Sequence, residues 1–455
     1  MIVARCRLAQ AGSAFHCQAK RNRGNPLTVP NSKWLRVLRD MALTAGPKIA
    51  GGVLILLLNV GLVFVWPPVI YGNWAFWLML VFLADALIGA PFDLAVIRLA
   101  QSTLNDASSA DVPIISALGC EHAAMIMKML LLLPAGLVFI VTGQSAGEVA
   151  SGEPLALPSL AALGAFLLLR STLVHLQMRR RFASYGAVET LHVVLRLTFA
   201  GFAVWLAGLG PAALMWSFAA AAASATAFSV YASRRSLLLC SDGIASAARA
   251  TASQVSWYLP TIALGAVIGR LDLLLMGWLS NAQELGQYGA AANFAVAPEL
   301  VGTYLGIALL PTLVSHVQAG LGRRFLVQSH AVMLSAALSM YAAAFVLAEP
   351  LLLRYAPQAY ASMVPLLLIL LGGTLAGMLT TPLALPLVLL TQKDFLLKTD
   401  FVVAPVAFLA YWIAIPAFGA MGTATVATAV HVVRSIAVHA MAWRLSAHVH
   451  DLRRH

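Results

Sequence analysis

Long apolar segments alternate with short polar connections along most of the chain. A bilayer core of about 30 Å is crossed by a helix of about 20 apolar residues. Segments of that length, bounded by charged residues, proline and glycine, therefore predict transmembrane helices. Twelve are expected, near residues 42–66, 73–97, 113–142, 156–176, 184–207, 211–231, 251–279, 287–315, 326–348, 361–390, 399–415 and 419–442.

The seventh, eighth and tenth segments are long enough to require tilt or a kink. Pro382 and Pro386 favour a kink in the tenth, because proline removes a helical hydrogen bond. Pro298, next to Glu299 in the eighth segment, has the same effect and predicts a bend that can serve in gating. The pattern as a whole predicts an all-α polytopic membrane protein.

Composition supports the same class. Of the 455 residues, 61% are hydrophobic and 10% are charged, whereas soluble domains carry about 25% charged residues. The net charge of +12 is spread between apolar segments, so nucleic acid is not an expected partner. The four cysteines form no C-x-x-C pair, and neither a disulfide framework, a metal site nor a cofactor is expected.

The basic residues also predict the orientation. If the N-terminus lies inside, 22 of the 29 lysines and arginines lie in inner connections and tails, and Arg354 alone lies outside. By the positive-inside rule, both termini are expected in the cytoplasm, with the chain in the bacterial inner membrane. Residues 1–40 are basic and lack the apolar core of a signal peptide, which predicts a disordered cytoplasmic tail. Met41 is an alternative translation start to Met1.

The basic connection 232–250 divides the segments into two sets of six. Tyr71-Gly72 begins the second predicted helix, and Tyr288-Gly289 begins the eighth, 217 residues later. Matching dipeptides at like-oriented helices favour two parallel repeats related by an axis along the membrane normal. We therefore expect two six-helix lobes around a central cavity, residues 41–231 and 251–445, with a second cytoplasmic tail at 446–455.

Several stretches resemble the Wzx-type polysaccharide-biosynthesis exporters of the multidrug/oligosaccharidyl-lipid/polysaccharide (MOP) superfamily. That family has an Asp in the seventh span, a G-x-Y-x-x-A entrance to the eighth and a P-x-x-S end to it. It also has a P-x-x-G-x-x-G-A entrance to the twelfth span, in which this chain has Gly-Thr for the final Gly-Ala. In the first half, Tyr71-Gly72 and Ile97-Arg98 resemble the family's Y-G and terminal-Arg positions. The matching residues in the second half are Asp272, Gly286–Ala291, Pro311–Ser315 and Pro416–Thr423.

The resemblance implies two facing lobes and alternating access. It also implies a cargo, an undecaprenyl-diphosphate-linked oligosaccharide moved from the inner to the outer leaflet for surface polysaccharide. Coupling to an H⁺ or Na⁺ gradient and association with a polysaccharide polymerase machinery are implied in the same way.

Six basic residues lie inside the predicted spans, where a cation costs roughly 2.5–3.5 kcal/mol. Each needs a carboxylate, a route to the interface or an anionic ligand. A cargo with a diphosphate is such a ligand, because cations replace its lost hydration and arginine binds phosphate in a bidentate manner. The candidate substrate-binding cations are Lys48, Lys128, Arg170, Arg196, Arg270 and Arg434.

Arg270 lies midway along its span, too far from either end to reach water easily. Asp272 is about 200° further around the helix, so it needs a different partner. Lys48, in contrast, lies within the first turns of its span and can reach the inner headgroups.

The carboxylates within the spans can neutralise these cations or bind a coupling ion. Glu121 and Lys128 share one face of the third helix, beside His122, and Glu189, His192 and Arg196 form a polar stripe on the fifth. An internal ion pair and a proton or substrate relay both fit such stripes. The candidate acids are Asp85, Asp93, Glu121, Glu189, Asp272 and Glu299.

Other functions remain open. The chain has no Walker A motif, and its longest outer connection, 143–155, has only Glu148 and Glu153 as carboxylates, so neither an ATPase nor a membrane-embedded glycosyltransferase is expected. A cation-coupled multidrug exporter of the same superfamily is the main alternative, and a non-transporting partner in a polysaccharide assembly complex is another. Six acids match six cations, so an anionic cargo is favoured only if the acids lie away from the cavity.

Overall fold

The computed structural model describes residues 46, 50–106, 115–146, 154–179, 181–207, 210–233, 244–302, 322–355, 358–380, 384 and 393–451. These residues are almost entirely helical, and they include eight helices long and apolar enough to cross a membrane. A bent helix pair would make a ninth, and a shorter apolar helix covers Ala50–Val65. An all-α membrane protein is confirmed by this arrangement, while the count of twelve spans stays a prediction.

Besides the helix Ala50–Val65, the described residues of the first half form six further helices and one π-helical turn. They are α3 (Pro68–Ala84), η1 (Asp85–Gly89), α4 (Ala90–Asp106), α5 (Ile115–Ala146), α7 (Ala156–Met178), α8 (Phe182–Ala207) and α9 (Pro211–Ser233). The second half provides α10 (Ile244–Ile268), α11 (Leu271–Leu279), α12 (Ala282–Ala295), α14 (Gly322–Tyr355), η2 (Gln358–Tyr360), α15 (Met363–Thr380) and α17 (Lys393–Asp451).

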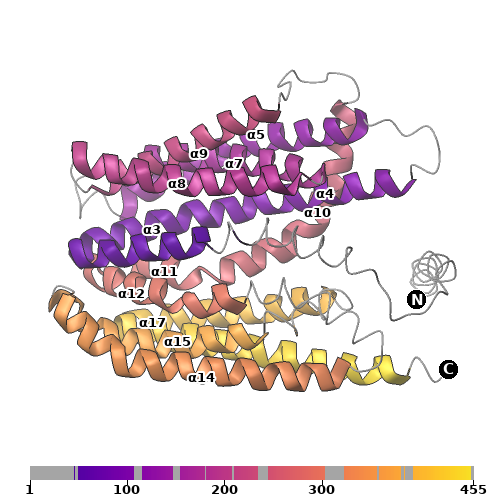
Figure 1. The fold of residues 1–455 in the computed structure, drawn as a ribbon. Helices are drawn as coiled ribbons and strands as arrows, with labels where there is room; N and C mark the ends of the chain where they lie inside the picture. Colours follow the sequence, from indigo (N-terminus) through magenta and orange to yellow (C-terminus); the bar gives the residue numbers. More distant parts are fainter. Residues whose placement is uncertain are drawn as a thin grey trace.

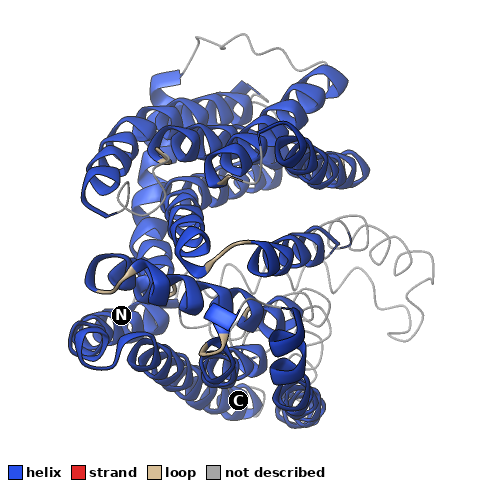
Figure 2. Cartoon of the chain, turned by 90° about the vertical axis from the view of Figure 1, so that its left-hand side faces the viewer, coloured by secondary structure: helices blue, strands red, loops and turns tan. Residues whose placement is uncertain are grey.

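These helices lie in two groups, which Figure 1 shows one above the other. Helices α5, α7, α8 and α9 form the upper group, and α14, α15 and α17 form the lower one, with α3, α10, α11 and α12 between them. Figure 2, turned by 90°, again separates the groups and views many helices nearly end-on. One apolar core is continuous across both groups and includes Trp74, Phe218, Tyr288, Leu370 and Tyr411.

The two groups meet closely where α3 packs on α12. Tyr71 and Tyr288 are both fully buried at this contact, and the amide of Asn293 donates to the Tyr71 hydroxyl over 2.9 Å. Gly286 is required here, because a Cβ on it would lie 1.8 Å from the carbonyl oxygen of Pro68. The two predicted Tyr-Gly pairs thus lie on helices that face each other.

Helix α17 folds back on itself at Gly419, where φ is 56° and ψ is −138°. Arg434 and Asp400 are 34 residues apart yet bonded over 2.8 Å, whereas a straight helix would separate them by about 50 Å. Glycine adopts this left-handed conformation without a Cβ clash. The Glu284 carboxylate accepts from the Ala420 amide over 3.1 Å and holds the start of the second arm. The break coincides with the predicted entrance to the twelfth helix.

Two other predicted irregularities are present. A bend of 53° separates α10 from α11 in the seventh segment. In the eighth, α12 ends at Ala295, and the helix resumes beyond Val296, next to Pro298. Pro382 and Pro386 lie outside the described residues.

Several predicted helix boundaries were wrong. The second helix begins at Pro68 rather than residue 73, because proline suits the first helical position. The eighth begins at Ala282 rather than 287, since the Asn281 side chain caps it by accepting from the Glu284 amide over 2.9 Å. Helix α10 begins at Ile244, inside the predicted connection 232–250.

Candidate functional site

Arg270 lies at the bend between α10 and α11, in the middle of the molecule. It is the N-cap residue of α11, with φ −134° and ψ 4°, and follows Gly269, whose flexibility favours a break. Its side chain borders two neighbouring cavities, of about 320 Å³ and about 250 Å³. Among the described residues, no side chain pairs with its guanidinium, so Arg270 presents an unpaired cation to the cavities.

Asp272 borders the larger cavity but is already hydrogen-bonded. One carboxylate oxygen accepts from the Leu273 amide over 2.7 Å, and the other accepts from the Tyr288 hydroxyl over 2.5 Å. The prediction that Asp272 needs a partner other than Arg270 is thereby met by Tyr288, which lies on α12.

Arg434 reaches the same cavity from the second arm of α17. Its Nε and Nη2 atoms donate to the two carboxylate oxygens of Asp400, over 2.8 and 2.9 Å. This bidentate geometry is the strongest arrangement of an arginine and a carboxylate. The polar part of the cavity lining is completed by Glu299, Thr374 and His431, so cationic and anionic groups both border it.

Arg170 belongs to a separate charge cluster, whose side chains come from η1, α4, α5 and α7. It donates to Asp85 over 2.6 Å and to Asp93 over 2.8 Å, and Asp93 also accepts from Lys128. The π-helical turn η1 begins at Asp85, and such single π turns inside helices are frequent at functional sites. Two cations and two carboxylates balance, which makes this cluster (Asp85, Asp93, Lys128 and Arg170) electrically neutral.

Lys128 lies deep in that cluster, with only 2% of its side chain exposed, and borders neither of the two cavities at Arg270. The predicted Glu121–Lys128 stripe makes interhelical bonds, but with other partners: Lys128 with Asp93, and Glu121 with His175 over 2.7 Å. A helical wheel places two residues on one face but does not identify what the neighbouring helix presents.

In the polar stripe predicted on α8 (Glu189, His192 and Arg196), the side chains likewise contact different groups. Glu189 accepts from the Tyr185 hydroxyl over 3.3 Å. Arg196 is fully buried, and its guanidinium carbon lies 3.3 Å from the centre of the Phe218 ring. Among the residues that the structure describes, its Nε and Nη2 atoms have no hydrogen-bond partner, and neither does Nε2 of His192.

One candidate, Lys48, lies outside the described residues. Two carboxylates that matter were missed. Asp400 lies at the edge of a predicted span, where it resembled a residue of the connection. The two predicted spans 399–415 and 419–442 form a hairpin, however, and this hairpin would have placed Asp400 and Arg434 at a similar depth. Glu284 lay in a predicted outer loop, and nothing in the sequence indicated its contact with Ala420.

No family model and no curated protein matches this sequence. Solved structures match in fold. The lipid II flippase MurJ, in an inward closed conformation, superposes with a TM-score of 0.68 at 10% identity, over 90% of each chain. The eukaryotic MATE transporter AtDTX14 gives 0.59 at 12% identity, over 92% of this chain and 99% of that one. A point mutant of the Vibrio cholerae MATE transporter VcmN gives 0.58 at 13% identity, over 92% and 97%. The chain therefore has the fold of these membrane transporters.

Proposed function

We propose that this chain is a flippase that moves an undecaprenyl-diphosphate-linked oligosaccharide from the inner to the outer leaflet of a bacterial inner membrane, for surface polysaccharide export. It works by alternating access between two six-helix lobes, with both termini in the cytoplasm, and is driven by an H⁺ or Na⁺ gradient. The polysaccharide polymerase machinery is its expected partner. The fold shared with a lipid II flippase and MATE transporters supports the transport class.

The observation that carries the proposed cargo is the unpaired Arg270 at the central cavities. Arg270 is exposed at the cavities, and a guanidinium that no described side chain pairs with is available to an anionic ligand, which supplies the opposite charge. Asp85, Asp93 and Glu121 do not border these cavities and are bonded to Arg170, Lys128 and His175. Asp272 and Glu299 do border the larger cavity, and Asp400 pairs with Arg434, so the proposed cargo rests on Arg270 itself and not on a surplus of cavity cations.

A cation-coupled multidrug exporter is the second candidate. Asp272 and Glu299 both border the larger cavity, and carboxylates there suit a cationic drug or a coupling ion. The two candidates differ in the charge of the ligand: Arg270 would attract the anionic diphosphate of a lipid-linked oligosaccharide and repel a cationic drug.

The test is surface polysaccharide in a deletion strain complemented with wild type, Arg270→Ala, Arg270→Lys or Arg249→Ala. Arg249 is a matched control, because it is an exposed arginine on α10 that borders neither of the central cavities. Losing one charge-assisted contact of about 1.5–3 kcal/mol predicts roughly a 10- to 100-fold loss of export for Arg270→Ala.

Trapping of lipid-linked repeat units on the inner leaflet in the deletion strain and in Arg270→Ala, with export retained in Arg249→Ala, is the expected outcome. Normal polysaccharide in the deletion strain would overturn the flippase assignment. Increased sensitivity to cationic drugs in that strain would support the exporter instead.

A further inference from the structure

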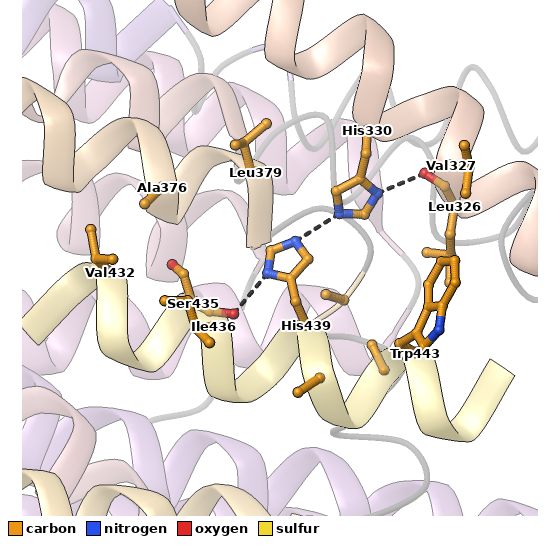
Figure 3. A pocket seen from close by; sticks show the side chains of 13 residues that line it. Leu326, Val327, His330, Ala376, Leu379, Val432, Ser435, Ile436, His439 and Trp443 are labelled. Atoms are coloured by element: carbon orange, nitrogen blue, oxygen red, sulfur yellow. Dashed lines mark hydrogen bonds between the residues drawn. The ribbon is translucent and has the colours of Figure 1, made fainter. Parts of the chain in front are cut away.

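A second site lies away from the central cavities, where the ends of α14, α15 and α17 border an open cavity of about 720 Å³ (Figure 3). Its lining is apolar except for Ser435 and two histidines. His330 comes from α14 and His439 from the second arm of α17, and Figure 3 shows their rings directed at each other. The rings lie edge to face, with 4.8 Å between their centres.

The outer hydrogen bonds of this pair define where its protons must be. Nδ1 of His330 lies 2.7 Å from the carbonyl oxygen of Leu326, and Nδ1 of His439 lies 2.7 Å from that of Ser435. A carbonyl oxygen only accepts hydrogen bonds, so each Nδ1 must carry a proton and donate it. In two neutral rings, both Nε2 atoms would then be bare lone pairs.

The two Nε2 atoms lie 2.8 Å apart. Two lone pairs at that distance repel, and the contact becomes a hydrogen bond only if a third proton lies between them. A zinc ion does not fit, because zinc–nitrogen bonds of about 2.0–2.1 Å place two tetrahedral ligand atoms about 3.3 Å apart. We propose that His330 and His439 form a proton-binding site, which holds one proton between its Nε2 atoms and thereby clasps α14 to the second arm of α17.

Among the described residues that line the cavity, only the histidine pair can carry a charge. From α15, the Thr380 hydroxyl lies 3.4 Å from Nδ1 of His439. No aspartate, glutamate, lysine or arginine is among the described residues that line the cavity. Charged residues on the same helices lie outside the lining, and Arg434 is paired with Asp400. Those whose side chains the structure describes are Arg324, Glu349, Arg354, Asp394, Lys398, Asp400, Arg434 and Arg444.

Loss of the proton removes the bond between the helices and leaves two lone pairs in contact. The clasp is therefore closed while the proton is bound and opens when the proton is lost. Apolar contacts of Leu326 and Met333 with Val438 and Ala442 hold the same helices together, so the opening is local rather than a loss of fold. The site rests on the geometry of the pair and does not depend on the cargo proposed above.

Solid-state ¹⁵N NMR of histidine-labelled protein in lipid tests the site directly. The difference spectrum between wild type and His330→Gln separates the signals of the pair from those of the rest of the chain's 11 histidines. We expect three protonated nitrogens in the pair at low pH, with one Nε2 proton lost as pH rises to about 9. Two neutral rings without an Nε2 proton at pH 5 would overturn the site, as would bound metal at one equivalent per chain.

The clasp is tested by electron paramagnetic resonance distances between spin labels at Val327 on α14 and Ala440 on α17, with the native cysteines replaced. In wild type, we expect the distance distribution to lengthen or broaden from pH 5 to pH 9. His439→Gln should abolish this pH response, whereas the control His431→Gln, on the same arm but at the central cavity, should keep it. An unchanged distribution in wild type would refute the clasp whether or not the flippase assignment holds.

Discussion

Two arginines in this molecule, Arg170 and Arg270, differ in whether a carboxylate neutralises the charge of the guanidinium. Arg170 is bonded to Asp85 and Asp93, and Lys128 completes a neutral cluster inside the first group of helices. Arg270, at the bend between α10 and α11, borders two cavities without a paired side chain among the described residues. A charge that carries its own counterion is tolerated inside a helix bundle, while one that lacks it is available to a ligand.

Removing the carboxylate of Asp93, which pairs with both Lys128 and Arg170, should lower stability more than any of the later substitutions. Asp93→Asn leaves Lys128, only 2% exposed, without its carboxylate. An uncompensated buried charge lowers the free energy of unfolding by about 3–5 kcal/mol. Thermal unfolding in detergent checks this, with Asp85→Asn as the matched variant, because Arg170 then keeps Asp93 and Lys128 is undisturbed. Equal losses in the two variants would contradict the central role of Asp93.

Asp400→Asn would turn a paired arginine into an unpaired one. Arg434 would lose its carboxylate but keep its position at the larger cavity. Because the Arg434 side chain is 32% exposed, solvent screens its charge, and we expect a smaller loss of about 1–2 kcal/mol. The same variant should bind an anionic ligand at least as well as wild type. Weaker binding, measured on folded protein, would argue that Arg434 acts only as a pair with Asp400.

Tyr288→Phe removes one hydrogen-bond donor from Asp272, the carboxylate nearest to Arg270 in the sequence. Asp272 would lose one donor and keep the Leu273 amide. The expected cost is about 1 kcal/mol, the net value of one such hydrogen bond. Chemical unfolding in mixed micelles measures it. Binding of an anionic ligand should fall, because a less satisfied Asp272 competes for Arg270, and an increase would contradict that competition.

Arg196→Met should have the smallest effect on stability. Arg196 is buried without hydrogen bonds at Nε and Nη2, and its stacking on Phe218 only partly offsets its desolvation. We expect the free energy of unfolding to stay within about 1 kcal/mol of wild type or to rise. A large loss would show that Arg196 has a partner in the membrane-embedded protein, as Arg170 does.

Sequence patterning predicted the helices and their irregularities well. Apolar length places most spans within a few residues, and the breaks near Arg270, Pro298 and Gly419 follow from local chemistry. The pairing of charges could not be predicted in the same way. Asp93 bridges Lys128 and Arg170 from a different helix, and Asp400 meets Arg434 only because α17 folds back. Such contacts depend on how helices are arranged, whereas periodicity within one helix fixes only its own faces.

The most direct test of the account is ligand binding to the purified protein in nanodiscs. Undecaprenyl diphosphate and the neutral undecaprenol would be compared for wild type, Arg270→Ala and Arg249→Ala. We predict that wild type and Arg249→Ala prefer the diphosphate, and that Arg270→Ala loses this preference by roughly 10- to 100-fold, the value of one charge-assisted contact. An unchanged preference in a folded Arg270→Ala protein would contradict the claim that the unpaired arginine binds the anionic head of the cargo.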